Sequence, residues 1–148
     1  MIYIGADHGG YKLKEQLKKF LAKKKLEFLD VGAKSLKAED DYPDYAKLVA
    51  KKVSQNPMRN VGILICRSGQ GVCIVANKFE YVRAALVWNT KEAEMSRTDD
   101  MSNILCLPSD YISVKEAEKI VEVWLTTPYS TDERHIRRVK KISAIEVK

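Results

Sequence analysis

The chain has 148 residues, 45% of them hydrophobic and 31% charged, which is ordinary for one globular domain with a single core. Its 3 cysteines lack CxxC spacing, so we expect neither a disulfide framework nor a metal site, and a reducing cytoplasm suits them best. The net charge of +6 comes with no nucleic-acid-binding module, the start of the chain has no signal-peptide pattern, and no apolar run approaches the roughly 20 residues of a membrane span, so we expect no nucleic-acid or membrane partner.

The first half of the chain alternates strands with amphipathic helices. Residues 2–6 and 27–31 have the β-branched pattern of strands. Between them, apolar residues spaced i, i+4, i+7 and i+8 predict a helix: Leu13, Leu17, Phe20 and Leu21. A second helix opens at Asp41-Tyr42-Pro43, because a proline near the first turn costs little there. Its inner face is apolar: Ala46, Val49, Ala50 and Val53.

The second half repeats this alternation. Residues 61–65 form a near-continuous apolar strand, as expected where both faces of a sheet are covered. A turn at 67–71 leads into a helix from about 72 to 79. Further strands are predicted at 83–87 and 104–107, with a helix around 91–96 between them. A longer helix then carries Ala117, Ile120, Val121, Trp124 and Leu125 on one side. A basic helix over about 132–142 has Ile136, Val139, Ile142 and Ser143 on its packing side.

These strand-then-helix units predict a single α/β domain over residues 1–148, with a doubly wound parallel sheet and helices on both faces. In open sheets of this kind, ligands bind beyond the carboxyl ends of the strands. We therefore expect function at three segments, residues 7–10, 66–71 and 96–103, and place all three at that edge.

Cys66 is the first candidate for chemistry. It ends the most apolar strand and comes just before a helix, where backbone N–H groups and the helix dipole favour an anion and lower the pKa of a thiol. The structural alternative is a small core residue, which we expect of Cys73 and Cys106. The following turn, Arg67-Ser68-Gly69-Gln70-Gly71, lets the backbone approach an oxyanion or phosphate. It matches neither a Walker loop nor a dinucleotide fingerprint.

Polar residues at two other places join this list. Asp7 and His8 end the first strand, where a near-adjacent pair favours a functional role over a structural one. Arg134 and Arg138 are i, i+4 neighbours on the last helix, so both guanidinium groups can reach one phosphate, and a terminal helix can supply them to a partner subunit. The alternative for this pair is a solvated basic helix face.

Taken together, these residues resemble the ribose-5-phosphate isomerase type B family, which also includes the galactose-6-phosphate isomerase subunits. The resemblance covers nearly the whole chain, and its marks occur in the family's order. They are Ala6-Asp7-His8-Gly9, Asp41-Tyr42-Pro43, Gly62-Ile63-Leu64-Ile65-Cys66 with the Ser-Gly-x-Gly turn, Ala76-Asn77-Lys78, Arg83-Ala84-Ala85, and Arg134-His135 with Arg138.

The resemblance implies a Rossmann-like five-stranded parallel sheet and a homodimer or dimer of dimers with active sites at the subunit interface. It implies no metal and no organic cofactor. Cys66 would be the base that shifts a proton between neighbouring carbons of aldose and ketose, while Ser68 and the backbone of Gly69, Gln70 and Gly71 stabilise the enediolate. The remaining contacts to the sugar phosphate would come from Asp7, His8, Tyr42, Arg134 and Arg138.

The chain departs from the family at four positions. Asp99 and Asp100 replace a His-Asn pair whose histidine helps to open the sugar ring, so Asp99 is expected to take that role and Asp100 to contact substrate. Arg67 replaces a small residue, and Asp110 replaces a phosphate-binding arginine. We hypothesise that Arg67 pairs with Asp99 or Asp100, or takes over from the lost arginine at the ligand.

Ribose 5-phosphate and ribulose 5-phosphate are therefore the first expected pair. Another four- to six-carbon sugar phosphate is the runner-up, because weak ring opening favours open-chain substrates. A non-catalytic phosphate- or nucleotide-binding module is the third alternative, since fold alone never determines function. It would leave Cys66 without a role.

Overall fold

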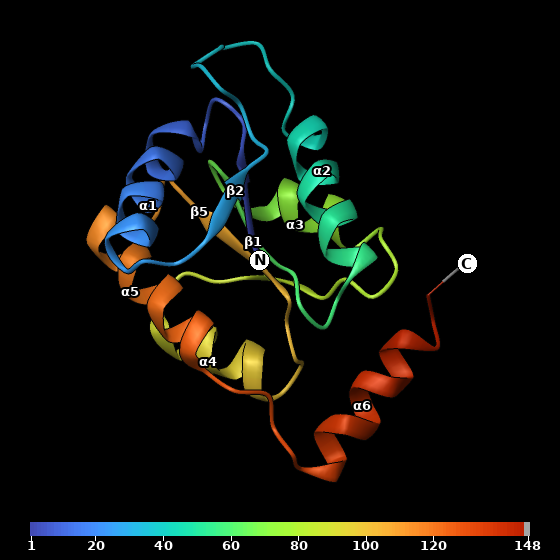
Figure 1. The fold of residues 1–148 in the computed structure, drawn as a ribbon. Helices are drawn as coiled ribbons and strands as arrows, with labels where there is room; N and C mark the ends of the chain where they lie inside the picture. The colour runs from blue at the N-terminus through green and yellow to red at the C-terminus, as the bar shows by residue number, and fades with distance from the viewer. Residues whose placement is uncertain (147–148) are drawn as a thin grey trace.

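The computed structural model describes residues 1–146 and folds them as a parallel sheet between two layers of helices (Figure 1). The strands are β1 (Ile2–Ala6), β2 (Phe28–Asp30), β3 (Val61–Cys66), β4 (Ala84–Leu86) and β5 (Ile104–Pro108). The helices are α1 (Tyr11–Lys23), α2 (Tyr42–Gln55), α3 (Gln70–Ala76), α4 (Thr90–Thr98), α5 (Val114–Thr126) and α6 (Glu133–Ser143). Neighbouring strands are all parallel, in the order β2-β1-β3-β5-β4, which confirms the predicted doubly wound five-stranded sheet.

Each face of the sheet has its own apolar core. On one face the leucines of the predicted α1 stripe are buried and its Phe20 is half-buried, and the stripe meets α5, whose Trp124 is fully buried. On the other face α2 and α3 pack together, and the predicted inner face of α2 is fully buried: Ala46, Val49, Ala50 and Val53. The hydrophobic periodicity therefore identified the inner side of both helices correctly, because burial of that side is what makes such helices stable.

Helix α3 begins two residues earlier than predicted and ends at Ala76 rather than near 79. Its start is set by Gly69, whose φ of 73° turns the chain sharply into the helix. Its end is set by Asn77, whose side chain donates to the Ala84 carbonyl and accepts from the Ala84 N–H, both at 2.9 Å. Gln70 and Gly71 thus belong to the first turn of the helix rather than to a loop before it.

The segment 96–103 was predicted at the wrong edge of the sheet. It ends α4 and enters β5, and the Asn103 carbonyl accepts a hydrogen bond from Gly62 at the start of β3 (2.9 Å). A segment that leads into a parallel strand necessarily lies at the amino edge. Cys66 is four residues further along β3, which corresponds to roughly 13 Å at about 3.3 Å per residue.

Helix α6 projects away from the sheet and the other helices (Figure 1). His135 is the buried residue of this helix. Of its predicted packing side, Ile136 and Val139 are half-buried and Ile142 is 40% exposed, so that side is only partly covered within the protomer. In residues 1–146, no helix combines the length and apolar character that crossing a membrane would require.

Candidate active site

The carboxyl ends of β1 and β3 form the crevice of this sheet. After β1 the chain moves outward to β2 and then returns to the other side of β1 to form β3, so the topology reverses between these two strands. The two following loops touch there: a Cβ added to Gly9 would lie 2.7 Å from the Arg67 side chain. The Ser109 hydroxyl lies 2.8 Å from the Gly9 carbonyl oxygen and 3.1 Å from that of Cys66, so β5 holds both loops in place.

Cys66 ends β3 in this crevice with 6% of its surface exposed. The Gly69 N–H donates a hydrogen bond to its sulfur over 3.2 Å. This contact depends on the positive φ of Gly69, which folds the N–H back toward the strand end. The same N–H is in place to donate to a thiolate, the form of cysteine that acts as a base.

The other two cysteines, for which a structural role is predicted, differ in how deeply they are buried. Cys106 is fully buried within β5, and burial raises the pKa of its thiol well above the ordinary value. Cys73 is half-buried on α3, and its thiol donates to the Ala84 carbonyl (3.3 Å). Neither receives a hydrogen bond from the turn that follows β3.

The turn after Cys66 is ordered by its own groups and by α2. The Ser68 hydroxyl accepts a hydrogen bond from the Gln70 N–H (3.3 Å). A Cβ on Gly71 would lie 2.7 Å from the ring of Tyr42, so the first residue of α2 packs directly on this turn. The structure therefore brings the predicted residues Tyr42, Ser68 and Gly71 to the same edge as Cys66.

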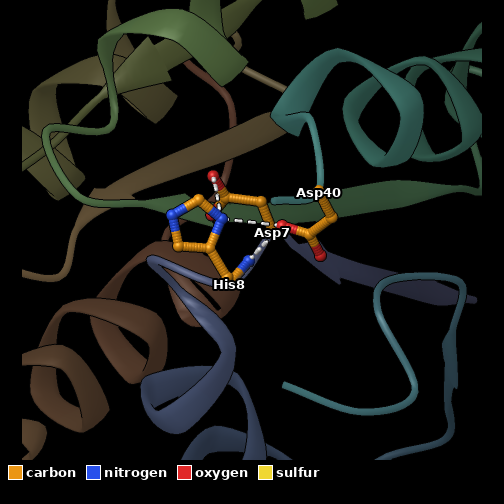
Figure 2. A group of neighbouring side chains, drawn as sticks. All are labelled: Asp7, His8 and Asp40. Atoms are coloured by element: carbon orange, nitrogen blue, oxygen red, sulfur yellow. Dashed lines mark hydrogen bonds and ion pairs between the residues drawn. The ribbon is translucent and has the colours of Figure 1, made fainter. Parts of the chain in front are cut away.

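Asp7 and His8 lie at this edge too, together with a residue that sequence reasoning missed. The Asp7 carboxylate accepts a hydrogen bond from the Gly10 N–H (3.1 Å), which shapes the loop after β1. Figure 2 shows the Asp40 carboxylate facing His8: Asp40 Oδ1 accepts from the His8 backbone N–H at 2.8 Å and lies 2.7 Å from ring atom Nδ1. Asp40 lies on the irregular segment between β2 and α2, where no periodic pattern signals its contact with His8.

These contacts raise the pKa of His8 and lower the pKa of Asp40. The hydrogen bond to Asp40 is the main cause that raises the pKa of His8 above its ordinary value, with Asp7 adding to it. Burial has the largest single effect and would raise the pKa of Asp40, but the hydrogen bonds and charge of His8 together with the neighbouring Tyr45 hydroxyl hold that pKa below its ordinary value. Ligand atoms of Asp7, His8 and Asp40 lie within 4.8 Å of one another, a spacing that suits a cation. The His8–Asp40 hydrogen bonds already satisfy Asp40 Oδ1 without one.

Four of the predicted site residues lie far from Cys66 within one protomer: Asp99, Asp100, Arg134 and Arg138. Asp99 follows α4 at the amino edge, where its carboxylate accepts from the Thr98 hydroxyl (2.9 Å). The Arg134 guanidinium forms an ion pair with the Asp132 carboxylate, with 3.0 Å between Nε and Oδ2, and Arg138 is exposed one helical turn further on. These groups cannot meet Cys66 in the same protomer, because the length of the sheet separates them.

Within one protomer, the structure does not bring Arg67 to either of its hypothesised carboxylate partners. Within residues 1–146, Arg67 forms no ion pair with Asp99 or Asp100, because it lies on the carboxyl edge and they lie on the amino edge. Its side chain is exposed and its stem passes close to Gly9. Its carbonyl accepts from the N–H of Asp110 (3.0 Å), so the two unusual residues are neighbours at the rim.

His135 belongs to the motifs that carry the family resemblance, but the sequence predicts no role for it. It is 8% exposed, and its Nδ1 lies 3.9 Å from the Asp99 carboxylate. Among the described residues, that ring nitrogen has no hydrogen-bond partner. Sequence spacing offers no signal for this contact, since the two residues come from different helices.

Comparison with known proteins agrees with this geometry. The model of the Ribose/Galactose Isomerase family matches residues 2–142. The "probable ribose-5-phosphate isomerase B" of Mycoplasma pneumoniae is 44% identical over 145 residues, which cover 98% of this chain and 94% of that protein. Ribose-5-phosphate isomerase B of Mycobacterium tuberculosis is 34% identical over 98% of this chain and 89% of its own length.

Solved structures give the same result. The crystal structure of ribose-5-phosphate isomerase B from Mycoplasma genitalium with bound ribulose 5-phosphate has a TM-score of 0.95 and 43% identity, and the match covers 98% of this chain and 95% of that one. The enzyme from Clostridium thermocellum has a TM-score of 0.93 and 40% identity, covering 98% and 96% of the two chains. The chain therefore belongs to the ribose/galactose isomerase family of aldose–ketose isomerases.

Proposed function

We propose that this chain interconverts ribose 5-phosphate and ribulose 5-phosphate through an enediolate, with Cys66 as the base. The observation that carries the proposal is the position of Cys66, at the switch point of the sheet with the Gly69 N–H donated to its sulfur. The names of the relatives support the substrate, and so does the ribulose 5-phosphate held by the Mycoplasma genitalium enzyme. A thiolate base also suits the reducing cytoplasm that the free cysteines indicate.

The proposed isomerisation uses only side chains and backbone N–H groups of this protein. The Cys66 thiolate takes the proton from C2 of the aldose, and negative charge develops on the carbonyl oxygen as the enediolate forms. The Ser68 hydroxyl and the backbone N–H groups of the turn stabilise that charge, each preorganised donor contributing about 3–4 kcal/mol. A proton then passes from the C2 hydroxyl to the C1 oxygen, and the thiol returns its own proton to C1, which yields the ketose and regenerates the thiolate. No metal or organic cofactor takes part in this scheme.

The second half of the site comes from a partner protomer in this proposal. Asp7, His8 and Tyr42 lie with Cys66 and contact the sugar hydroxyls, whereas Asp99, Asp100, Arg134 and Arg138 lie too far away in the same chain. Helix α6 projects from the domain with an incompletely covered apolar side, as expected of a helix that packs on a second copy. A homodimer, or a dimer of dimers, brings the arginines to the substrate phosphate.

Another four- to six-carbon sugar phosphate is the second candidate substrate. The observation that favours it is the aspartate at position 99, where the family has a ring-opening histidine. The Asp99 side chain is 41% exposed and lies 3.9 Å from His135, and a carboxyl group can act as the acid in ring opening only while it carries a proton. An open-chain substrate escapes that requirement. The third alternative, a non-catalytic module, leaves both Cys66 and the family membership unexplained.

The deciding experiment is a coupled isomerase assay over four- to six-carbon sugar phosphates. We expect Cys66→Ala to lower kcat by roughly 10²–10⁴-fold, the usual contribution of a positioned base. Cys73→Ser is the matched control, because Cys73 lies outside the crevice, and it should keep most of the activity. Activity that survives in Cys66→Ala would refute the mechanism.

The same panel assigns Asp99. If Asp99 opens the ring, Asp99→Asn loses far more activity on ribose 5-phosphate than on a tetrose phosphate, which cannot close a five-membered ring through its phosphorylated oxygen. Equal losses on both substrates would remove Asp99 from ring opening. A wild type that turns over only open-chain substrates would replace ribose 5-phosphate with the second candidate.

A further inference from the structure

Asp40 makes an unusual double contact with His8. One carboxylate oxygen, Oδ1, accepts the backbone N–H of His8 at 2.8 Å and lies 2.7 Å from its ring atom Nδ1. The Asp40 side chain is only 9% exposed, whereas that of His8 is 29% exposed toward the crevice. The contact joins residues 32 positions apart in the sequence. It therefore fixes both the backbone and the ring of His8.

The contact determines which ring nitrogen of His8 carries the hydrogen. An ionised carboxylate only accepts hydrogen bonds, so the short Nδ1 contact requires a hydrogen on Nδ1. Ring atom Nε2, which points away from Asp40 in Figure 2, is then free to accept a hydrogen bond, or to donate one when the ring is protonated. Isolated neutral histidine does not hold this tautomer without such a partner.

The charged groups around the His8–Asp40 pair also favour a hydrogen on His8 Nδ1. Asp7 Oδ2 lies 4.0 Å from His8 Nδ1 and adds a second negative charge. Tyr45 of α2 stands beside Asp40, and burial followed by the nearby carboxylate raises the pKa of its hydroxyl, which keeps it neutral. From the turn after β3, the Arg67 stem passes next to Gly9. Two carboxylates thus face the ring from the side of Nδ1, and they hold the hydrogen there.

The segment that carries Asp40 is anchored at its start. The Asp30 carboxylate accepts from the Gly32 N–H (2.9 Å), and the Ala33 N–H donates to the carbonyl at the end of β1 (3.1 Å). Buried Lys14 donates to the Ala33 carbonyl over 2.8 Å. At its other end the segment runs directly into α2. Asp40 is therefore presented to His8 from a segment tied down on both sides.

We propose that Asp40 is a positioning residue of the active site, which holds His8 in the Nδ1–H tautomer so that Nε2 meets a hydroxyl or ring oxygen of the sugar phosphate. This inference rests on the proposed function for its substrate. The tautomer of His8 in the free protein does not depend on that function, so the two can be tested separately.

The first test is ¹⁵N NMR of the histidine rings at about pH 8–9, where an ordinary histidine is neutral. The chain has 2 histidines, so His135→Gln assigns the signals of His8. In the wild type we expect a His8 ring with its hydrogen on Nδ1. In Asp40→Asn we expect the pKa of His8 to fall toward its ordinary value and this tautomer to be lost. Glu39→Gln, an exposed carboxylate in the same segment, is the control and should leave the spectrum unchanged. An Nε2-protonated His8 in the wild type would overturn the proposal.

The second test is kinetic. We expect Asp40→Asn to lower kcat/KM for ribose 5-phosphate by about tenfold or more, as for loss of a hydrogen bond to a charged group, and mainly through KM. Asp40→Glu should recover part of the loss, and Glu39→Gln should match the wild type. If the wild type is active and Asp40→Asn alters the His8 spectrum but leaves the kinetics unchanged, the proposal is also overturned. An inactive wild type would instead refute the proposed function and leave the NMR result to decide the role of Asp40.

Discussion

At the scale of single residues, Gly69 determines the hydrogen bond that the Cys66 sulfur receives. Its φ of 73° lies in the left-handed region, where L side chains are strained. An added Cβ would also lie 2.5 Å from a methyl group of Leu86 and 3.0 Å from the backbone of Leu107. Only glycine combines this conformation with this space, and the conformation aims its N–H at the Cys66 sulfur. The hydrogen bond to the thiol thus depends on a neighbour that has no side chain.

The His8–Asp40 pair predicts a pH window for stability. The raised pKa of His8 means that its contribution is complete below the ordinary histidine value and is lost as pH rises through the raised one. The lowered pKa of Asp40 means that its contribution is complete above the ordinary carboxyl value and is lost as pH falls through the lowered one. The pair therefore stabilises the fold most near pH 5–6, between the ordinary values of about 3.9 and 6.5.

The measurement is a double-mutant cycle of His8→Gln and Asp40→Asn by urea unfolding. The coupling energy between the two residues should be larger at about pH 6 than at about pH 9, where the ring is neutral. A coupling that grows with pH would contradict the assigned charges.

At the scale of elements, a buried ion pair joins α1 to the end of β2. The Lys14 side chain is fully buried, and its ammonium lies 2.5 Å from the Asp30 carboxylate. Burial alone would raise the pKa of Asp30, but the hydrogen bonds from Lys14 and Lys18 hold it below the ordinary value. The pair positions the segment that leads from β2 toward Asp40, so it links the core to the candidate site.

Breaking this pair should cost far more than breaking a surface pair. Asp30→Ala leaves the Lys14 ammonium buried without its main partner, for which we expect a loss of about 3–5 kcal/mol in the free energy of unfolding. Asp44→Ala removes the partner of Lys47 in an exposed pair and should change stability by less than about 1 kcal/mol. Urea unfolding of both variants measures the difference. Equal effects would show that Lys14 reaches water or another acceptor when Asp30 is gone.

At the scale of the whole molecule, the predicted site residues divide into two groups at opposite edges of the sheet. Cys66 belongs to the carboxyl edge, whereas Asp99 and the arginines of α6 belong to the amino edge and the projecting helix. If a second copy unites them, each complete site takes Cys66 from one protomer and Arg138 from the other. Such an arrangement has a measurable consequence.

Two inactive variants should complement each other. When Cys66→Ala and Arg138→Ala protomers are mixed and reassembled, half of the dimers are mixed and each of these has one intact site, so about a quarter of the wild-type activity should return. Cys66→Ala mixed with Ser68→Ala is the control, because both changes affect the same half of the site and no site is intact. If the first mixture stays as inactive as the control, the two residues do not act across an interface.

How much the sequence predicts depends on whether a feature is local. The buried faces of α1 and α2, the strand that ends at Cys66 and the helix start at Asp132 all follow from short-range periodicity and capping, and the structure confirms them. The start of α3 was misplaced because nothing in the letters Ser-Gly-Gln-Gly shows that Gly69 has a positive φ. The position of 96–103 was mistaken because its polar composition resembles a ligand-binding loop, although its connection into β5 requires the amino edge.

The sequence by itself therefore determined the fold class, the family and the residue expected to act as base, because these rest on periodic burial and on motifs that are contiguous in the chain. Only the tertiary structure decided that Asp40 reaches His8, that Arg67 lies apart from Asp99, and that the arginines of α6 cannot reach Cys66 within one protomer. The physical reason is that these relations depend on chain packing between elements distant in sequence. Local propensity carries no information about where such elements meet.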